Sequence, residues 1–167
     1  LFVLDWLTKH WIVTRFQDPE AAYNPELLHR IEVIPGFFNL VRVHNRGMAW
    51  GLGDGLAWAN VLFVGIAIVA MTFLTILWFK NAFPTRWSRL AVTLLVAGVF
   101  GNVFDRLYRG YVVDFLDFNF GKFGHFPSFN VADSCICIAA GLLIITAILG
   151  DPEEKSEAKP DSDAKDS

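Results

Sequence analysis

The stretch that decides the fold is Leu56–Phe79, LAWANVLFVGIAIVAMTFLTILWF, which contains no charged residue. The hydrocarbon core of a bilayer is about 30 Å thick, so roughly 20 apolar residues in a helix cross it. Two more stretches meet the same requirement, Arg89–Tyr108 and Phe129–Leu149. The chain is therefore predicted to cross a membrane several times.

A fourth candidate span stands at the beginning of the sequence. Leu1–Phe16 is apolar but short, and it contains Asp5 and Lys9. We expect a truncated first span whose start precedes the sequence as given. The predicted fold is an all-α integral membrane protein, one domain over residues 1–149, with four transmembrane helices. The spans are expected at about 1–16, 56–79, 89–108 and 129–149.

Residues 150–167 differ in composition from the rest of the chain. They read GDPEEKSEAKPDSDAKDS, with seven acidic and three basic side chains and no aromatic one. Such a segment buries too little apolar surface to offset the entropy of ordering it. We predict a disordered acidic tail without a chemical role.

The loop between the first two spans contains the pattern of a β-hairpin. Ile31–Ile34 and Phe37–His44 flank Pro35 and Gly36. Proline followed by glycine is typical of the central positions of a type II turn, because glycine accepts a positive φ. We predict a small extracytoplasmic hairpin at the membrane surface.

Basic residues indicate the orientation of the spans. The short loop between the second and third spans has Lys80, Arg86 and Arg89 near the helix ends, and such residues mark cytoplasmic loops. Both termini are then cytoplasmic. The hairpin loop and a second outer loop, residues 109–128, face outward. The second loop mixes polar and aromatic residues, a composition that suits the membrane interface.

Ionisable residues within spans are costly and usually face a bundle interior or a water-filled cavity. Asp5 and Lys9 are four residues apart, so one helical turn brings their opposite charges together. We interpret this pair as structural, tying the first span to the outer hairpin.

Two further polar faces are predicted to meet at the outer ends of the third and fourth spans. Their members are Asn102, Asp105 and Arg106 on the third span, and Asn130 and Asp133 on the fourth. Asp105 and Arg106 are adjacent, and they can neutralise each other or bind other partners. Asp114 follows the break that Gly110 offers and reaches the same level.

Asp114 and Asp133 could therefore converge at the outer membrane boundary. Two carboxyl groups held close in a low dielectric share one proton. The ionised partner can activate a water that attacks a peptide carbonyl, while the protonated partner donates a hydrogen bond to that carbonyl. Spacing alone leaves three interpretations open: peptide hydrolysis, an ion or proton path, and a structural polar cluster.

Five blocks of the sequence resemble the lipoprotein signal peptidase (signal peptidase II) family. They are DWLTK at Asp5–Lys9, NRGMAWG at Asn45–Gly51, GNVFDR at Gly101–Arg106, VVDF at Val112–Phe115 and FNVADS at Phe129–Ser134. Their order and their places relative to four spans match the family over nearly the whole chain before the tail. Trp6, Met48 and Trp50 stand where Gln, Ala and Phe are more familiar.

The resemblance implies an aspartic endopeptidase whose catalytic pair is Asp114 and Asp133. It implies a membrane bundle of four helices with a small outer β-cradle, and an architectural role for Asp5 and Lys9. The residues expected to line the site are Asn45, Gly47, Asn102, Asp105, Arg106 and Asn130.

The implied reaction removes the signal peptide from a diacylglyceryl-modified prolipoprotein, before the lipidated cysteine, in the bacterial inner membrane. Acyl burial contributes about 0.8 kcal/mol per CH₂ and would hold such a substrate at the membrane surface. The expected partners are the prolipoprotein and membrane lipids, not nucleic acid, and the chain is expected to be a monomer. No metal or other cofactor is implied, because no His, Cys and acidic residues have ligand spacing.

Three alternatives make different predictions. A small proton- or ion-coupled transporter needs polar groups through the bilayer depth or a repeat pair, whereas here they gather at one end. A structural membrane protein would lose stability together with any function in Asp114→Asn and Asp133→Asn. A Ser/Lys peptidase would combine Ser128 or Ser134 with a lysine, and the only lysine within a span is Lys9.

Overall fold

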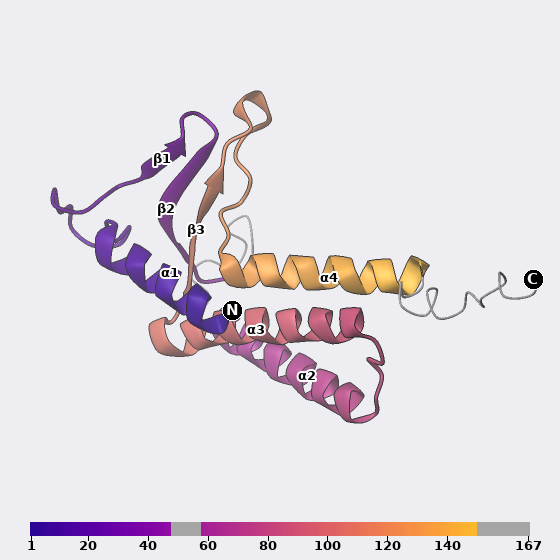
Figure 1. Ribbon diagram of the computed structural model, residues 1–167. Helices are drawn as coiled ribbons and strands as arrows, with labels where there is room; N and C mark the ends of the chain where they lie inside the picture. Colours follow the sequence, from indigo (N-terminus) through magenta and orange to yellow (C-terminus); the bar gives the residue numbers. More distant parts are fainter. Residues whose placement is uncertain (48–57, 150–167) are drawn as a thin grey trace, which may run out of the picture.

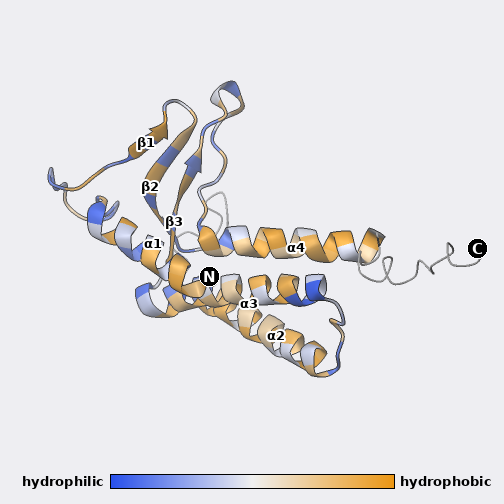
Figure 2. Cartoon of the chain, viewed as in Figure 1, coloured by the Kyte–Doolittle hydropathy of each residue, from blue (hydrophilic) through white to orange (hydrophobic). Residues whose placement is uncertain are grey.

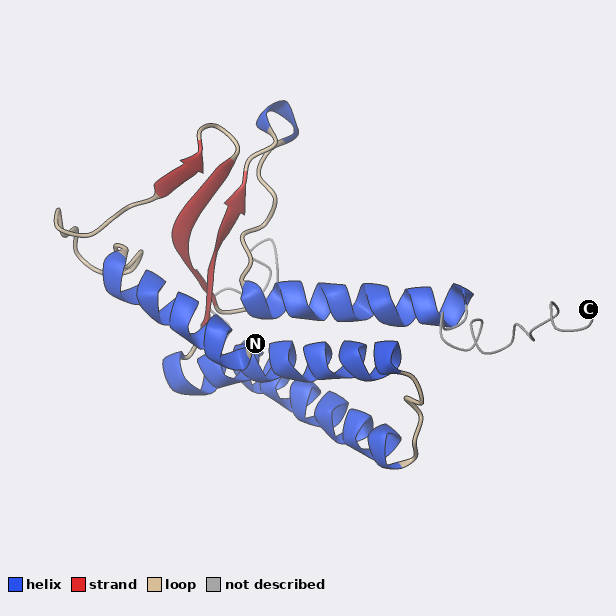
Figure 3. Ribbon diagram, viewed as in Figure 1, coloured by secondary structure: helices blue, strands red, loops and turns tan. Residues whose placement is uncertain are grey.

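The computed structural model describes residues 1–47 and 58–149, in which a block of helices carries a small sheet at one end (Figure 1, Figure 3). The elements in chain order are α1 (Phe2–Arg15), β1 (Ile31–Ile34), β2 (Phe38–Asn45), α2 (Ala59–Phe79), α3 (Arg86–Arg109), β3 (Val112–Phe118), the 3₁₀ helix η2 (Gly121–Phe123) and α4 (Val131–Leu149). The predicted tail, residues 150–167, lies outside the described residues.

Three helices of the described chain are long and apolar enough to cross a membrane, namely Ala59–Phe79, Arg86–Arg109 and Val131–Ile148. Hydrophobic residues predominate along α2 and α4 (Figure 2). Many large apolar side chains on these helices are exposed, as lipid-facing residues must be in a bundle whose solvent is the bilayer. Three of the four predicted spans are thus confirmed. α1 is helical as predicted, but its 14 residues reach only about 21 Å.

Two local signals set the ends of α3. Thr85 and Ser88 form a capping box, in which each side chain bonds the backbone N–H of the other, so the helix begins three residues before the predicted span. Gly110 ends it with φ 82°, a left-handed conformation that glycine adopts without steric cost. The predicted break at Gly110 is confirmed, and it turns the chain directly into β3.

Small residues allow α1, α3 and α4 to pack closely near the sheet. A Cβ added at Gly98 would lie 2.4 Å from the carbonyl oxygen of Ala132. A Cβ at Gly101 would lie 2.7 Å from Asp5 Oδ2 and 3.2 Å from the Cβ of Ala132. Glycine at these two positions therefore lets the polar faces of the three helices meet.

The sheet has the order β1-β2-β3 with antiparallel pairing throughout. The predicted hairpin is confirmed: Phe37 N–H donates to the Ile34 carbonyl at 3.0 Å, and Gly36 has φ 72°. β2 begins at Phe38, one residue later than predicted.

The fold was predicted as all-α with a small β-hairpin or β-cradle, and the structure has a three-stranded sheet whose third strand lies in residues 109–128, the predicted second outer loop. Val112–Phe118 of this segment forms β3, which pairs with β2 so that Val43 stands opposite Asp114. Five of the first six residues of β3 are buried, and because successive residues of a strand point to opposite faces, both faces of β3 are covered. A strand covered on both sides lacks the alternation of polar and apolar residues that identifies a strand in sequence.

The sheet is fixed to the end of α1 by an apolar core and by one arginine. Ile12 and Phe16 pack against Val113 and Phe115. Arg42 of β2 donates 3.2 Å hydrogen bonds to the carbonyl oxygens of Val13 and Phe16, two of the last carbonyls of α1. The sheet thus lies at the end of α3 and α4 opposite the α2–α3 turn (Figure 1).

Candidate active site

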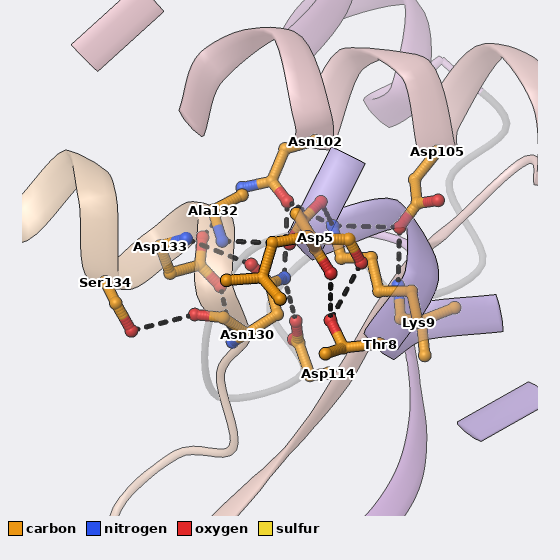
Figure 4. Close-up of polar contacts among 12 residues, drawn as sticks. Asp5, Thr8, Lys9, Asn102, Asp105, Asp114, Asn130, Ala132, Asp133 and Ser134 are labelled. Atoms are coloured by element: carbon orange, nitrogen blue, oxygen red, sulfur yellow. Dashed lines mark hydrogen bonds and ion pairs between the residues drawn. The ribbon is translucent and has the colours of Figure 1, made fainter. Parts of the chain in front are cut away.

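Four polar side chains from three elements meet where the sheet joins the helices (Figure 4). Asp114 comes from β3, Asn102 from α3, and Asn130 and Asp133 from the beginning of α4. The structure therefore brings together the two predicted acids and two of the predicted lining residues.

Asp114 is buried and is held by two amides. Its Oδ1 accepts from Asn130 Nδ2 at 2.7 Å and its Oδ2 accepts from Asn45 Nδ2 at 3.0 Å. Burial, followed by the charge of Asp133, raises the pKa of Asp114 from 3.8 to about 7, although the two amides and the charge of Lys9 lower it. This carboxyl group can therefore hold a proton near neutral pH.

Asp133 is positioned by the N-terminal capping hydrogen bonds of α4. Asn130 precedes the helix, and its Oδ1 accepts from the Asp133 backbone N–H at 2.9 Å, while Asp133 Oδ2 accepts from the Asn130 N–H at 3.2 Å. This reciprocal pattern is a capping box built from Asn and Asp. Asp133 Oδ1 also accepts from Asn102 Nδ2 at 2.7 Å. The carboxylate is thus oriented by both α3 and α4.

Asn130 connects the two acids. It caps Asp133 and donates to Asp114, and its Nδ2 also lies 3.2 Å from Asn102 Oδ1. Asn130 is fully buried, so these hydrogen bonds are not exchanged for water.

Behind this group lies a buried ion cluster. Lys9 Nζ is 2.8 Å from Asp5 Oδ2 and 3.0 Å from Asp105 Oδ2. Asp5 Oδ1 accepts from the Ala132 N–H at 2.9 Å, and Asp105 Oδ2 accepts from the N–H at the second residue of β3 at 3.2 Å. The predicted Asp5–Lys9 pair is confirmed. The expectation that it ties α1 to the hairpin is wrong, since it ties α1 to α3 and α4.

Asp105 belongs to the buried ion cluster and binds partners other than its neighbour. Its Oδ1 pairs with Arg109, one turn along α3, rather than with the adjacent Arg106. Among the described residues, the ion pairs and hydrogen bonds of the Asp105 carboxylate join it to Lys9, Arg109 and the backbone N–H of Val113. These contacts join Asp105 to the ion cluster, and the expectation that Asp105 lines the site stays a prediction.

Arg106 lies at the rim of the group. Its Nη1 donates to the Asn102 carbonyl at 3.3 Å, and its guanidinium lies 4.8 Å from the centre of the Phe63 ring on α2. Its charge interacts with Asp133 and Asp114. Its Nε is buried and has no hydrogen-bond partner within the described part of the chain. Arg106 can therefore still donate to a bound molecule.

The remaining predicted residue, Gly47, supports Asn45. Its N–H donates to Asn45 Oδ1 at 3.2 Å, which turns the amide nitrogen of Asn45 toward Asp114. Met48 and Trp50, the departures noted in this block, lie outside the described residues.

Two residues that contact the surroundings of the site, Arg109 through Asp105 and Phe63 through Arg106, were not predicted from the sequence. Arg109 could have been found, because it stands four residues after Asp105 on the same helix face. Phe63 stacks under Arg106 from α2, and no pattern in the apolar segment distinguishes it from its neighbours.

The arrangement suits acid–base chemistry on a polar bond. Two carboxyl groups face one amide network, and one of them has a pKa suited to carrying a proton. Ser134 Oγ donates to the Asn130 carbonyl at 3.0 Å, and Lys9 pairs with Asp5 and Asp105. Ser134 and Lys9 therefore do not form a Ser–Lys catalytic pair. Within residues 1–47 and 58–149, no three His, Cys, Asp or Glu side chains are grouped to hold a metal ion.

Comparison with known proteins gives consistent matches over the described chain. A family model described as signal peptidase (SPase) II matches residues 1–149. The lipoprotein signal peptidase of Shewanella sediminis (strain HAW-EB3) is 44% identical over 160 residues, which cover 94% of this chain and 84% of that protein. The lipoprotein signal peptidase of Vibrio vulnificus (strain CMCP6) is 44% identical over 128 residues, 76% of this chain and 75% of that protein.

Solved structures show the same fold. A bacterial membrane enzyme determined at 2.3 Å by the in meso method superposes with a TM-score of 0.70 at 35% identity, covering 95% of this chain and 86% of that chain. A second such structure, at 1.9 Å, gives a TM-score of 0.73 at 33% identity over 88% of this chain and 86% of that chain.

Proposed function

Since the chain belongs to the signal peptidase II family, we propose that it cleaves signal peptides from prolipoproteins as an aspartic endopeptidase, with Asp114 and Asp133 as the catalytic pair. The observation that supports this pair most directly is the position of Asn130, which caps Asp133 and donates to Asp114 at 2.7 Å. One buried side chain thereby connects the two acids.

In the proposed reaction the pair holds one proton, which resides on Asp114. The carboxylate of Asp133 takes a proton from water as the water oxygen bonds to the scissile carbonyl carbon. Asp114 gives its proton to the carbonyl oxygen in the resulting tetrahedral intermediate. The intermediate collapses as its hydroxyl returns that proton to Asp114, the C–N bond breaks, and Asp133 gives its proton to the leaving amine.

Two features support this assignment. Burial and the nearby Asp133 raise the pKa of Asp114 to about 7, so its acid form is populated at neutral pH. Asp133 accepts hydrogen bonds from Asn102 and Asn130, donors that stabilise a carboxylate. We propose that Arg106, whose charge interacts with both acids, also binds the substrate backbone.

The proposed substrate is a prolipoprotein whose cysteine carries a diacylglyceryl group. The site lies at one end of three helices that can cross a membrane, so a bond presented at the membrane surface would meet it. We propose that this end is extracytoplasmic in the bacterial inner membrane and that both termini are cytoplasmic. Lys80, Arg86 and Arg89 at the opposite end of the helices support that orientation. The enzyme is proposed to act as a monomer among lipids.

A proton- or ion-coupled transporter is not favoured. The buried ion pairs of Asp5, Lys9 and Asp105 lie at the sheet end of the helices. α2 contains no charged residue that could extend a polar path through the bilayer. A path across the bilayer needs polar groups at successive depths.

The test is cleavage of a diacylglyceryl-modified prolipoprotein by the purified protein in detergent. Asp114→Asn and Asp133→Asn should each lower kcat by at least about 10³-fold, the scale of general acid–base catalysis. Asp117→Asn is the matched control, because Asp117 is a buried acid on the same strand that binds Asn39 and His125 instead. Thermal unfolding of each variant checks that it is folded. A folded Asp114→Asn or Asp133→Asn protein with the control's activity would refute the proposed pair.

A further inference from the structure

Lys9 is fully buried, and its ammonium has three acceptors. Two are the carboxylates of Asp5 and Asp105, at 2.8 and 3.0 Å. The third is Asn102 Oδ1 at 3.1 Å, a contact that joins residues 93 positions apart. An ammonium carries three N–H donors and no acceptor, so each of its bonds has a partner here.

The third contact decides how the amide of Asn102 is turned. Because Lys9 can only donate, the oxygen of Asn102 must face it, and the NH₂ group must then face Asp133, to which it donates at 2.7 Å. The opposite orientation would set an NH₂ against an ammonium and an oxygen against a carboxylate, with two hydrogen bonds lost in a buried site.

The same oxygen extends the effect to the other acid. Asn102 Oδ1 also accepts from Asn130 Nδ2 at 3.2 Å, and that nitrogen donates to Asp114 Oδ1 at 2.7 Å. Figure 4 shows Lys9, Asn102, Asn130 and the two acids as one connected set. The only member of this set that must be a donor in every arrangement of the amides, apart from backbone N–H groups, is Lys9.

We propose that Lys9 is a positioning residue of the peptidase, which acts through the amide of Asn102 to aim hydrogen-bond donors at Asp133 and Asp114. This inference rests on the proposed function and goes beyond the structural role predicted for Lys9. The family resemblance and the ion pair with Asp5 required only that Lys9 neutralise an acid.

Arg109 offers a matched control for this role. Both cations pair with the carboxylate of Asp105, Lys9 at Oδ2 and Arg109 at Oδ1, and both side chains are nearly or fully buried. Only Lys9 also contacts Asn102. Lys9→Met and Arg109→Met therefore each remove one buried cation from the same acid, and they differ in whether the donor to Asn102 is lost.

The experiment measures kcat, KM and thermal stability of both variants on the diacylglyceryl-modified prolipoprotein, per folded enzyme. Lys9→Met should lower kcat by about 10²-fold with little change in KM, the scale expected when a catalytic group is displaced. Arg109→Met should lower stability and leave kcat per folded enzyme unchanged. Equal kcat per folded enzyme in the two variants would overturn the proposal.

The pH profile separates positioning from a loss of folded protein. The charged groups around Asp114 are Asp133 on α4, Lys9 on α1 and Arg106 on α3. The charge of Lys9 lowers the pKa of Asp114, so its removal should shift the alkaline limb of the kcat/KM profile to higher pH. Arg109→Met should leave that limb in place, and an unshifted limb in Lys9→Met would count against the proposal.

A second variant covers the case in which Lys9→Met does not fold. In Lys9→Met/Asp5→Asn the pair is removed as a unit, Asp105 keeps Arg109, and an amide oxygen at position 5 can still accept from the Ala132 N–H. This folded variant should show the same loss of kcat, and a wild-type kcat would overturn the inference. The proposed function is tested separately. It is refuted if the wild type does not cleave the prolipoprotein, or if Asp114→Asn and Asp133→Asn still cleave it.

Discussion

Gly101 of α3 and Asp5 of α1 are so close that no side chain fits at position 101. A Cβ there would lie 2.7 Å from Asp5 Oδ2, the oxygen that pairs with Lys9. Glycine at this position therefore lets α1 approach α3 closely enough for Asp5 and Lys9 to reach their partners. The close contact explains why a helix-destabilising residue stands within α3.

Gly101→Ala should lower both stability and activity. The added methyl group must push Asp5 away from Lys9 and from the Ala132 N–H, and overpacking of this kind costs about 1–3 kcal/mol. Gly141→Ala in α4 is the control, because nothing lies within 4 Å of its added Cβ and alanine favours a helix. Unfolding in detergent should rank Gly101→Ala below the wild type and Gly141→Ala at or above it; the same rank for both would contradict the packing argument.

Activity should fall as pH rises through about 7. The proposed reaction needs a proton on Asp114, and burial together with Asp133 raises the pKa of Asp114 to about 7. The free enzyme's kcat/KM profile should therefore have an alkaline limb near that value. Asp117→Asn should have the same limb, and a profile that stays flat to pH 9 would show that Asp114 is not the proton donor.

Stability should also depend on pH, with a sign fixed by the same group. The pKa of Asp114 is 3.8 in an unperturbed chain and about 7 in the folded protein. Between these values the folded state binds more protons than the unfolded state, so its stability falls as pH rises from about 4 to about 7. Thermal unfolding across this range should show the fall in the wild type and a smaller one in Asp114→Asn. Equal slopes in the two proteins would refute the assignment.

Arg42→Met should loosen the sheet from α1. Arg42 donates to the carbonyls of Val13 and Phe16 and pairs with Asp18 at 2.8 Å, and a lost hydrogen bond to a charged group costs about 1.5–3 kcal/mol. Because β2 also carries Asn45, kcat should fall with stability. Arg30→Met is the comparison, since the Arg30–Glu32 pair is exposed and such pairs contribute little. If both arginine variants unfolded at the same temperature, the hydrogen bonds of Arg42 to the end of α1 would not contribute to stability.

The sequence was informative wherever the cause of a structure is local. Pro35 and Gly36 predicted the turn between β1 and β2, Gly110 predicted the end of α3, and helical spacing predicted the Asp5–Lys9 pair. Each of these depends on residues within one turn of each other. The three confirmed spans were predicted from the length and apolarity of their sequences alone.

Contacts between distant segments were beyond this kind of inference. The bond between Lys9 and Asn102 depends on how closely α1 approaches α3, which Gly101 and Ala132 decide in three dimensions. β3 was missed because burial on both faces removes its polar alternation. For Asp105 the sequence left its partner open between the adjacent Arg106 and other groups; helix geometry turns adjacent side chains apart, and Arg109, four residues on, is the partner.

The position of Asn130 and Asp133 at the start of α4 has a consequence for the order of synthesis. The ribosome delivers the chain from its N-terminus, so Lys9, Asn102 and Asp114 emerge before the residues that complete the site. Until α4 packs against α3, Asp114 lacks the amide of Asn130, and its proposed partner acid is absent. The proposed site is therefore complete only after α4, the last helix of the described residues, has been synthesised and has packed against α3.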